Sequence, residues 1–236
     1  MNKNIFTVLI FSILSTLFLV GCVGNQATKK VFSEAEGKNE GTIKDENLRK
    51  AILEELDLVE YSKDPTKPSR EELERLVTLN AGVLKIASIE GLEAAIHLEE
   101  LTLGDNEISD LTSLKNLTSL ESLDLGSNKI SNISDLSYLT SLIRLNIEDN
   151  EISDISGLSN LTSLELLALS ENEISDVNAL STLTSLEVLG LSNNKIDNLS
   201  PLSSLTSLKT LFIKNNPIIN FTPVESLPNL EELFTE

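Results

Sequence analysis

The chain repeats one pattern of residues every 22 positions between Leu101 and Leu230, without an insertion or a deletion. Each repeat opens on Leu-x-Leu-x-x-Asn, and the opening leucines are Leu101, Leu123, Leu145, Leu167, Leu189 and Leu211. An unbroken period of this length is typical of a solenoid, in which each repeat packs only on its neighbours. We therefore expect a protein that works through an extended surface rather than through a catalytic pocket.

Each repeat contains two kinds of apolar spacing. Leu123 and Leu125 alternate with Asp124 and Gly126, which predicts a short strand with one buried face. After the strand the apolar residues lie three apart, whereas an α-helix would alternate spacings of three and four. We therefore predict an α/β solenoid with a parallel β-sheet on its concave face and a 3₁₀ or irregular convex side. The residues spaced by three are Ile130, Ile133, Leu136, Leu139 and Leu142.

The asparagine of the motif falls at a position whose side chain is expected to point into the core, where an unpaired polar group costs free energy. Its amide has both donors and acceptors, so it can bond backbone groups of its own coil and of a neighbouring one. We interpret the six asparagines as a structural ladder rather than as a row of ligand-binding amides. They are Asn106, Asn128, Asn150, Asn172, Asn194 and Asn216.

Two short helices are predicted ahead of the repeats. The first begins after Asp45 and places Leu48, Ile52, Leu56 and Val59 on one face. Ser69 followed by Glu72 three positions later is a capping box that predicts the start of the second. Residues 79–100 then follow the repeat frame, with Leu84 in place of the ladder asparagine.

These residues resemble the leucine-rich repeats, and the 22-residue form is similar to that of the bacterial internalins, over about residues 42–236. The resemblance implies a horseshoe with a helical N-terminal cap at 42–78 and a leucine-rich-repeat domain at 79–236. Within that domain it implies a cap repeat at 79–100 and six further repeats from 101. Internalins commonly continue into an immunoglobulin-like domain and a cell-wall sorting motif. This sequence contains neither, so the role of an invasin is not carried over directly.

Residues 1–21 have the character of a secretory signal. Lys3 precedes an apolar stretch from Ile5 to Val20, which would rise about 24 Å as a helix, short of a hydrocarbon core of about 30 Å. The stretch closes on Leu19-Val20-Gly21-Cys22, which looks like a bacterial lipobox. The resemblance implies a lipid on Cys22, the only cysteine. The polar residues that follow, with little apolar content, predict a flexible tether at 22–41. We therefore expect a protein of the bacterial envelope, anchored to a membrane and displayed at the cell surface.

The formal net charge of −19 disfavours nucleic acid and anionic lipid as partners. The single histidine, His97, lies at an expected exposed position of a return segment, without a nucleophile in register. The sequence contains no phosphate-binding loop or nucleophile motif. The recurring Asp110, Asp154 and Asp176 are expected to cap the return segments rather than to bind calcium. We expect a monomer without enzymatic activity, cofactor or metal.

Strand residues on either side of the buried leucines should project from the concave face. Leu166, Val188 and Phe212 are apolar there although the frame does not require it, and such clusters mark interaction sites. We predict that a protein partner, which could be a host protein, binds this face. The alternatives are a scaffold for another bacterial protein, with no host role, and a solute-capturing lipoprotein, which would need a cleft between two lobes. The predicted contact residues are Arg144, Asn146, Leu166, Ala168, Val188, Phe212 and Lys214.

Overall fold

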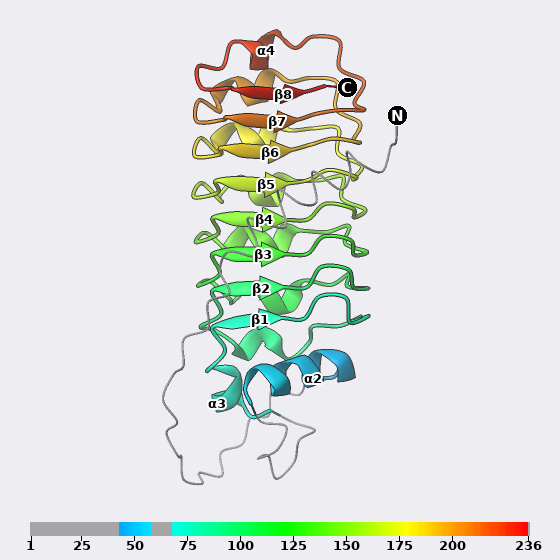
Figure 1. The fold of residues 1–236 in the computed structure, drawn as a ribbon, viewed down its shortest axis with the longest axis vertical. Helices are drawn as coiled ribbons and strands as arrows, with labels where there is room; N and C mark the ends of the chain where they lie inside the picture. Colours follow the sequence, from blue (N-terminus) through cyan, green and yellow to red (C-terminus); the bar gives the residue numbers. More distant parts are fainter. Residues whose placement is uncertain (1–42, 58–67, 236) are drawn as a thin grey trace. The chain divides into compact units, whose positions relative to one another are not determined.

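The structure is a computed structural model that describes residues 43–57 and 68–235. The predicted signal peptide at 1–21, the predicted lipid attachment at Cys22 and the predicted tether at 22–41 lie outside the described residues. The described chain forms one sheet of eight parallel strands, which stack in sequence order (Figure 1). The expected leucine-rich-repeat solenoid is therefore confirmed. The strands are β1 Thr78–Asn80, β2 Glu100–Thr102, β3 Ser122–Asp124, β4 Arg144–Asn146, β5 Leu166–Ala168, β6 Val188–Gly190, β7 Thr210–Phe212 and β8 Glu232–Phe234.

The register follows the sequence period, because each strand residue pairs with the residue 22 positions later. Leu101 faces Leu123, and Leu123 faces Leu145. The leucine at the centre of every strand from β1 to β7 is at most 2% exposed. A constant repeat length thus places equivalent side chains side by side and builds one continuous apolar core.

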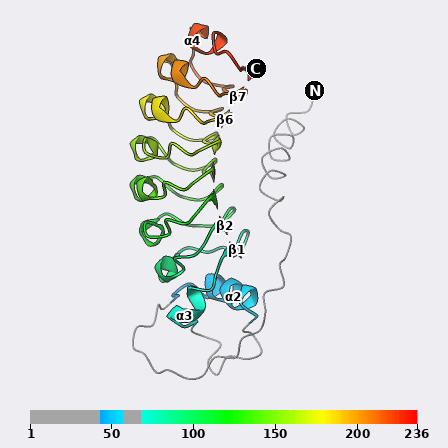
Figure 2. The ribbon, with the colours of Figure 1, turned by 90° about the vertical axis from the view of Figure 1, so that its left-hand side faces the viewer.

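The side opposite the sheet consists of short return segments, and six of them are 3₁₀ helices in the described chain (Figure 2). In the coil that begins at β3, the apolar residues spaced by three, from Ile130 to Leu142, are at most 1% exposed. The expected 3₁₀ return is confirmed. The segments are η1 Leu92–Ala94, η2 Thr112–Leu114, η3 Ser134–Tyr138, η4 Ser156–Leu158, η5 Asn178–Thr182 and η6 Ser200–Ser204, followed by the α-helical turn α4 Thr222–Glu225.

The sheet includes one strand that the repeat motif does not identify. β8 pairs Leu233 with Leu211, so the eighth strand continues the register. The second leucine of the frame is replaced there by Thr235. The pairing with β7 supplies the strand geometry that the residues alone do not specify.

Two helices pack on the first coil. In α2, Glu46–Glu55, the N-cap Asp45 accepts backbone hydrogen bonds from Asn47 and Leu48 at 2.9 and 3.1 Å. The other carboxylate oxygen of Asp45 accepts the backbone N–H of Ala87 at 3.0 Å, which connects the helix to the first coil. α3, Arg70–Leu73, begins with the capping box at Ser69. Leu48, Ile52 and Leu73 from these helices belong to the core of the repeats.

The ladder asparagines bond each coil to the one before it. The Asn150 side-chain oxygen accepts the backbone N–H of Ile130 at 3.0 Å. Its amide donates to the carbonyl oxygens of Leu125, Ile147 and Glu148 at 3.0–3.3 Å. In all six asparagines the side-chain oxygen accepts the backbone N–H of the residue 20 positions earlier, and the side-chain amide donates to the backbone carbonyl oxygen of the residue 25 positions earlier. A single side-chain type thus satisfies backbone groups that the turn leaves unpaired.

The residue before each ladder asparagine has a left-handed backbone, with φ between 53° and 56°. Asp and Asn tolerate this region better than most residues. The equivalent residue of the first coil is Val83, with φ 61° and 75% exposure. This left-handed turn places Asp105, Asp149 and Glu171 beside the ends of the strands, where they become part of the concave site.

Candidate interaction surface on the concave face

The outward side chains of the strands form two columns that run through all eight strands. The first strand residues make one column, in which Arg144, Leu166 and Val188 are consecutive. The last strand residues make the other, in which Asn146, Ala168 and Gly190 are consecutive. Adjacent strands lie about 4.8 Å apart, so consecutive members of a column contact one another. The two columns therefore form one continuous surface, on which polar and apolar side chains lie next to one another.

The predicted contact residues differ in exposure. Arg144, Asn146, Val188 and Lys214 are half-buried, and their side chains reach the surface. The expectation that the apolar members are exposed is wrong for three of them: Leu166, Ala168 and Phe212 are 4%, 0% and 6% exposed. Leu166 lies between Arg144 and Val188 in the same column. These three residues form the floor of the concave face rather than its outer layer.

The Phe212 ring lies against a second aromatic ring that sequence reasoning missed. The centroids of Phe212 and Phe234 are 4.6 Å apart and their planes differ by 8°. Phe234 stands 22 residues after Phe212, so the repeat period itself was the signal for this pair. The stack explains why Phe212 is buried although its strand phase is outward.

Acidic side chains lie beside these columns, and sequence reasoning did not assign them a role. Asp124 accepts hydrogen bonds from the backbone of Gly126 at 3.1 Å and from the Asn146 amide at 2.9 Å. Burial raises the pKa of Asp124. Burial, followed by repulsion from neighbouring carboxylates, raises the pKa of Glu148 from 4.5 to about 7. The sequence feature that could have predicted this cluster is the presence of acidic residues in adjacent repeats, at positions whose side chains point away from the core.

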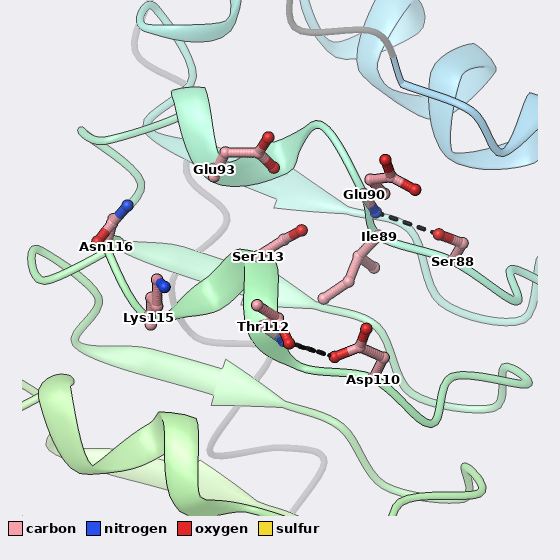
Figure 3. A pocket seen from close by; sticks show the side chains of 9 residues that line it. All are labelled: Ser88, Ile89, Glu90, Glu93, Asp110, Thr112, Ser113, Lys115 and Asn116. Carbon is pink, nitrogen blue, oxygen red and sulfur yellow. Dashed lines mark hydrogen bonds between the residues drawn. The ribbon is translucent and has the colours of Figure 1, made fainter.

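A pocket of about 430 Å³ lies on the convex side, between η1 and η2 (Figure 3). Its lining is mixed, because Ile89 lies among polar residues, and several of the polar groups form local hydrogen bonds. Asp110 accepts from the backbone and hydroxyl of Thr112 at 2.9 and 2.6 Å, and these bonds lower the pKa of Asp110. Glu93 accepts the backbone N–H of Gly91 at 2.8 Å. These acceptors are engaged within the protein.

The equivalent aspartates of later coils make the same local turn. Asp154 and Asp176 each accept a backbone N–H two residues later, at 2.8 Å. His97 is exposed. Across 43–57 and 68–235, no three acidic, histidine or cysteine side chains come together in a way that could hold a metal ion. In the same ranges, no helix has the length and apolarity needed to cross a bilayer.

Comparison with known proteins agrees with the fold. The family described as leucine-rich repeats in two copies matches residues 96–138 and 162–204. The chain is similar to the structure of internalin C2 from Listeria monocytogenes, with 29% identity and a TM-score of 0.65, over 85% of this chain and 100% of that one. It is also similar to internalin F of the same species, with 30% identity and a TM-score of 0.60, over 83% of this chain and 72% of that one.

A leucine-rich-repeat protein of Leptospira interrogans is similar at 27% identity and a TM-score of 0.67. That match covers 70% of this chain and 44% of the other. A search of curated protein sequences finds no match.

Proposed function

The chain belongs to the internalin-like leucine-rich-repeat proteins, and from this premise we propose that it binds a protein partner through the concave face of its repeats. The observation that carries the proposal is the pair of unbroken outward columns on the eight-stranded sheet. Arg144, Asn146, Val188 and Lys214 are the reachable contacts in this proposal. Leu166, Ala168 and Phe212 form the apolar floor beneath them.

The apolar floor and its polar rim suit protein binding. Interfaces draw most of their free energy from a few aromatic and arginine anchors, and a polar rim surrounds them. The stacked Phe212 and Phe234 and the neighbouring Leu166 give the face a rigid base. An open sheet surface of this kind fits a macromolecule better than a captured solute, which would need a cleft between two lobes. In this proposal the protein acts as a monomeric binding module rather than as an enzyme.

The cellular setting is a further part of the proposal. The lipobox-like Leu19-Val20-Gly21-Cys22 supports attachment to a bacterial membrane through a lipid on Cys22. The similarity to Listeria internalins supports display at the cell surface and a host protein as the partner. The second candidate function is a scaffold that holds another protein of the bacterial envelope, and the net charge of −19 is compatible with either.

Binding through the concave face is tested with two variants of one repeat. One variant adds a negative charge on the concave face and the other adds it on the convex face. Val188→Glu puts a carboxylate into the centre of the first column and is expected to weaken partner binding at least tenfold, as loss of an interface anchor does. Asn178→Glu puts the same charge on the exposed convex residue at the start of η5 and should leave binding unchanged. The measurement is capture from detergent extracts of animal-cell membranes and, separately, of bacterial envelopes, identified by mass spectrometry.

The informative proteins are those retained by wild type and by Asn178→Glu but lost with Val188→Glu. Their appearance only in the bacterial extract would select the envelope scaffold. Loss with Asn178→Glu and retention with Val188→Glu would place the site on the convex side. Equal thermal unfolding of the three proteins is the control for folding.

The anchor is tested by Cys22→Ala. Without the sulfur no lipid can be attached, so the variant should fail to incorporate a fatty-acid probe and should leave the membrane fraction. A Ser33→Ala substitution in the polar stretch that follows Cys22 is the matched control and should label as wild type does. Equal labelling of Cys22→Ala and wild type would refute lipid attachment at this residue.

A further inference from the structure

Five carboxylates from adjacent coils gather where strands β2 to β5 end. The negative charge of Asp105 raises the pKa of Asp124. The pKa of Glu148 is raised in the same way by three carboxylates, those of Asp124, Asp149 and Glu171. We call these five residues the acidic centre. Asp105, Asp149 and Glu171 are exposed, Asp124 is half-buried and Glu148 is buried. The group therefore has exposed acids around a buried one.

The backbone around the acidic centre is shaped to hold polar side chains close to the sheet. A Cβ atom at Gly126 would lie 2.8 Å from the Asn146 amide nitrogen, and one at Gly104 would lie 3.2 Å from an Asp124 carboxylate oxygen. The absence of side chains at these glycines lets Asn146 and Asp124 lie over the preceding coil. Asn146 in turn fixes Asp124 through its 2.9 Å hydrogen bond. The position of Asp124 is thus set before any partner arrives.

Glu148 is the unusual member of the acidic centre. The residue is 7% exposed, and its carboxylate oxygens keep some contact with solvent but make no hydrogen bond or ion pair among the described residues. By contrast, Asp124 has two hydrogen-bond donors and Glu171 accepts one hydrogen bond from Asn193. A largely buried carboxylate without a donor from the protein is costly, and the charged groups that act on Glu148 are all carboxylates. Such a group is compensated when a cation comes from outside.

We propose that the acidic centre binds a lysine or arginine side chain from a basic segment of the protein partner, with Glu148 as its buried acceptor. The proposal rests on the proposed function and adds the charge of the segment that occupies the face. A cationic side chain would donate charge-assisted hydrogen bonds to Glu148 and neutralise the repulsion from Asp124, Asp149 and Glu171. The net charge of −19 would attract such a segment over a distance.

A peptide cation fits this site better than a metal ion. Across 43–57 and 68–235, no three of the acidic side chains approach closely enough to form a metal-binding group. The five acids instead extend over four coils, from Asp105 to Glu171. A row of separated charges matches an extended segment with several basic residues.

The proposal is tested with the full-length chain in mild detergent and a short peptide of alternating arginine and serine. Glu148→Gln removes the buried acceptor, and Glu151→Gln removes one charge from an exposed position in the same coil. We expect Glu148→Gln to lower peptide affinity about tenfold and Glu151→Gln to leave it unchanged, at equal ionic strength. Wild-type affinity should rise between pH 6 and pH 8 as Glu148 loses its proton, and that of Glu148→Gln should rise less.

An equal effect of the two Gln substitutions would overturn the proposal, because binding would then follow net charge alone. Calcium binding by the wild type that depends on Glu148, without peptide binding, would also overturn it in favour of a metal site. If Glu148→Gln binds the peptide as tightly as the wild type does, while Val188→Glu still loses the captured partner, only the basic-segment proposal is refuted. Loss of the captured partner with Glu148→Gln but not with Glu151→Gln would support both proposals.

Discussion

A Glu148→Gln variant is expected to be more stable than the wild-type protein above pH 7, by on the order of 3 kcal/mol. Folding raises the pKa of this carboxyl from 4.5 to about 7, mainly by burial. Between these two values the native state keeps a proton that the unfolded state has lost, so the stability of the wild type falls as the pH rises from 4.5 to 7. Above pH 7 the penalty is complete, and the neutral glutamine avoids it.

The measurement is the free energy of unfolding in urea at pH 5 and pH 8. The variant should exceed the wild type at pH 8 and approach it at pH 5. Glu151→Gln, at an exposed position of the same coil, should match the wild type at both values. A stability of Glu148→Gln equal to that of the wild type at pH 8 would show that the carboxylate is not penalised in the native state. A stability gain combined with weaker peptide binding is the pattern expected of a group retained for binding.

Asn150→Leu is expected to destabilise the protein by about 3 kcal/mol or more, because several buried backbone groups lose their partner at once. The substitution leaves the N–H of Ile130 and the carbonyl of Leu125 without the hydrogen bonds that join the two coils. Leucine is similar in size to asparagine, so loss of packing does not account for the effect. Against a typical free energy of unfolding of 5–15 kcal/mol, the loss is large.

Asn116→Leu is the matched control, because Asn116 is exposed and its side chain forms no hydrogen bond among the described residues. It should change the urea midpoint little, since exposed substitutions usually alter stability by about 0.5 kcal/mol or less. An Asn150→Leu midpoint equal to that of the wild type would mean that water or relaxed backbone replaces the ladder at no cost.

The repeat period was enough to predict the fold because it fixes the register of every coil. A single slip would carry the leucines of a strand from the core to the surface, so a constant spacing of 22 leaves one arrangement that buries them all. The spacing of three in the return segments likewise predicted the 3₁₀ convex side. The eighth strand was missed, since Thr235 replaces the second leucine of its frame, and so was the α-helical turn α4 in the last return segment.

The sequence by itself determined the direction in which each strand side chain points, because that direction depends only on the alternation along the strand. The tertiary structure alone decided how deeply each outward side chain is covered. Leu166 and Phe212 point outward and are nevertheless buried by neighbours from adjacent strands. Glu148 is largely buried for the same reason, and two of the carboxylates that raise its pKa, Asp124 and Glu171, lie in other coils. Exposure and pKa depend on contacts between residues about 22 positions apart, and these contacts exist only once the coils have stacked.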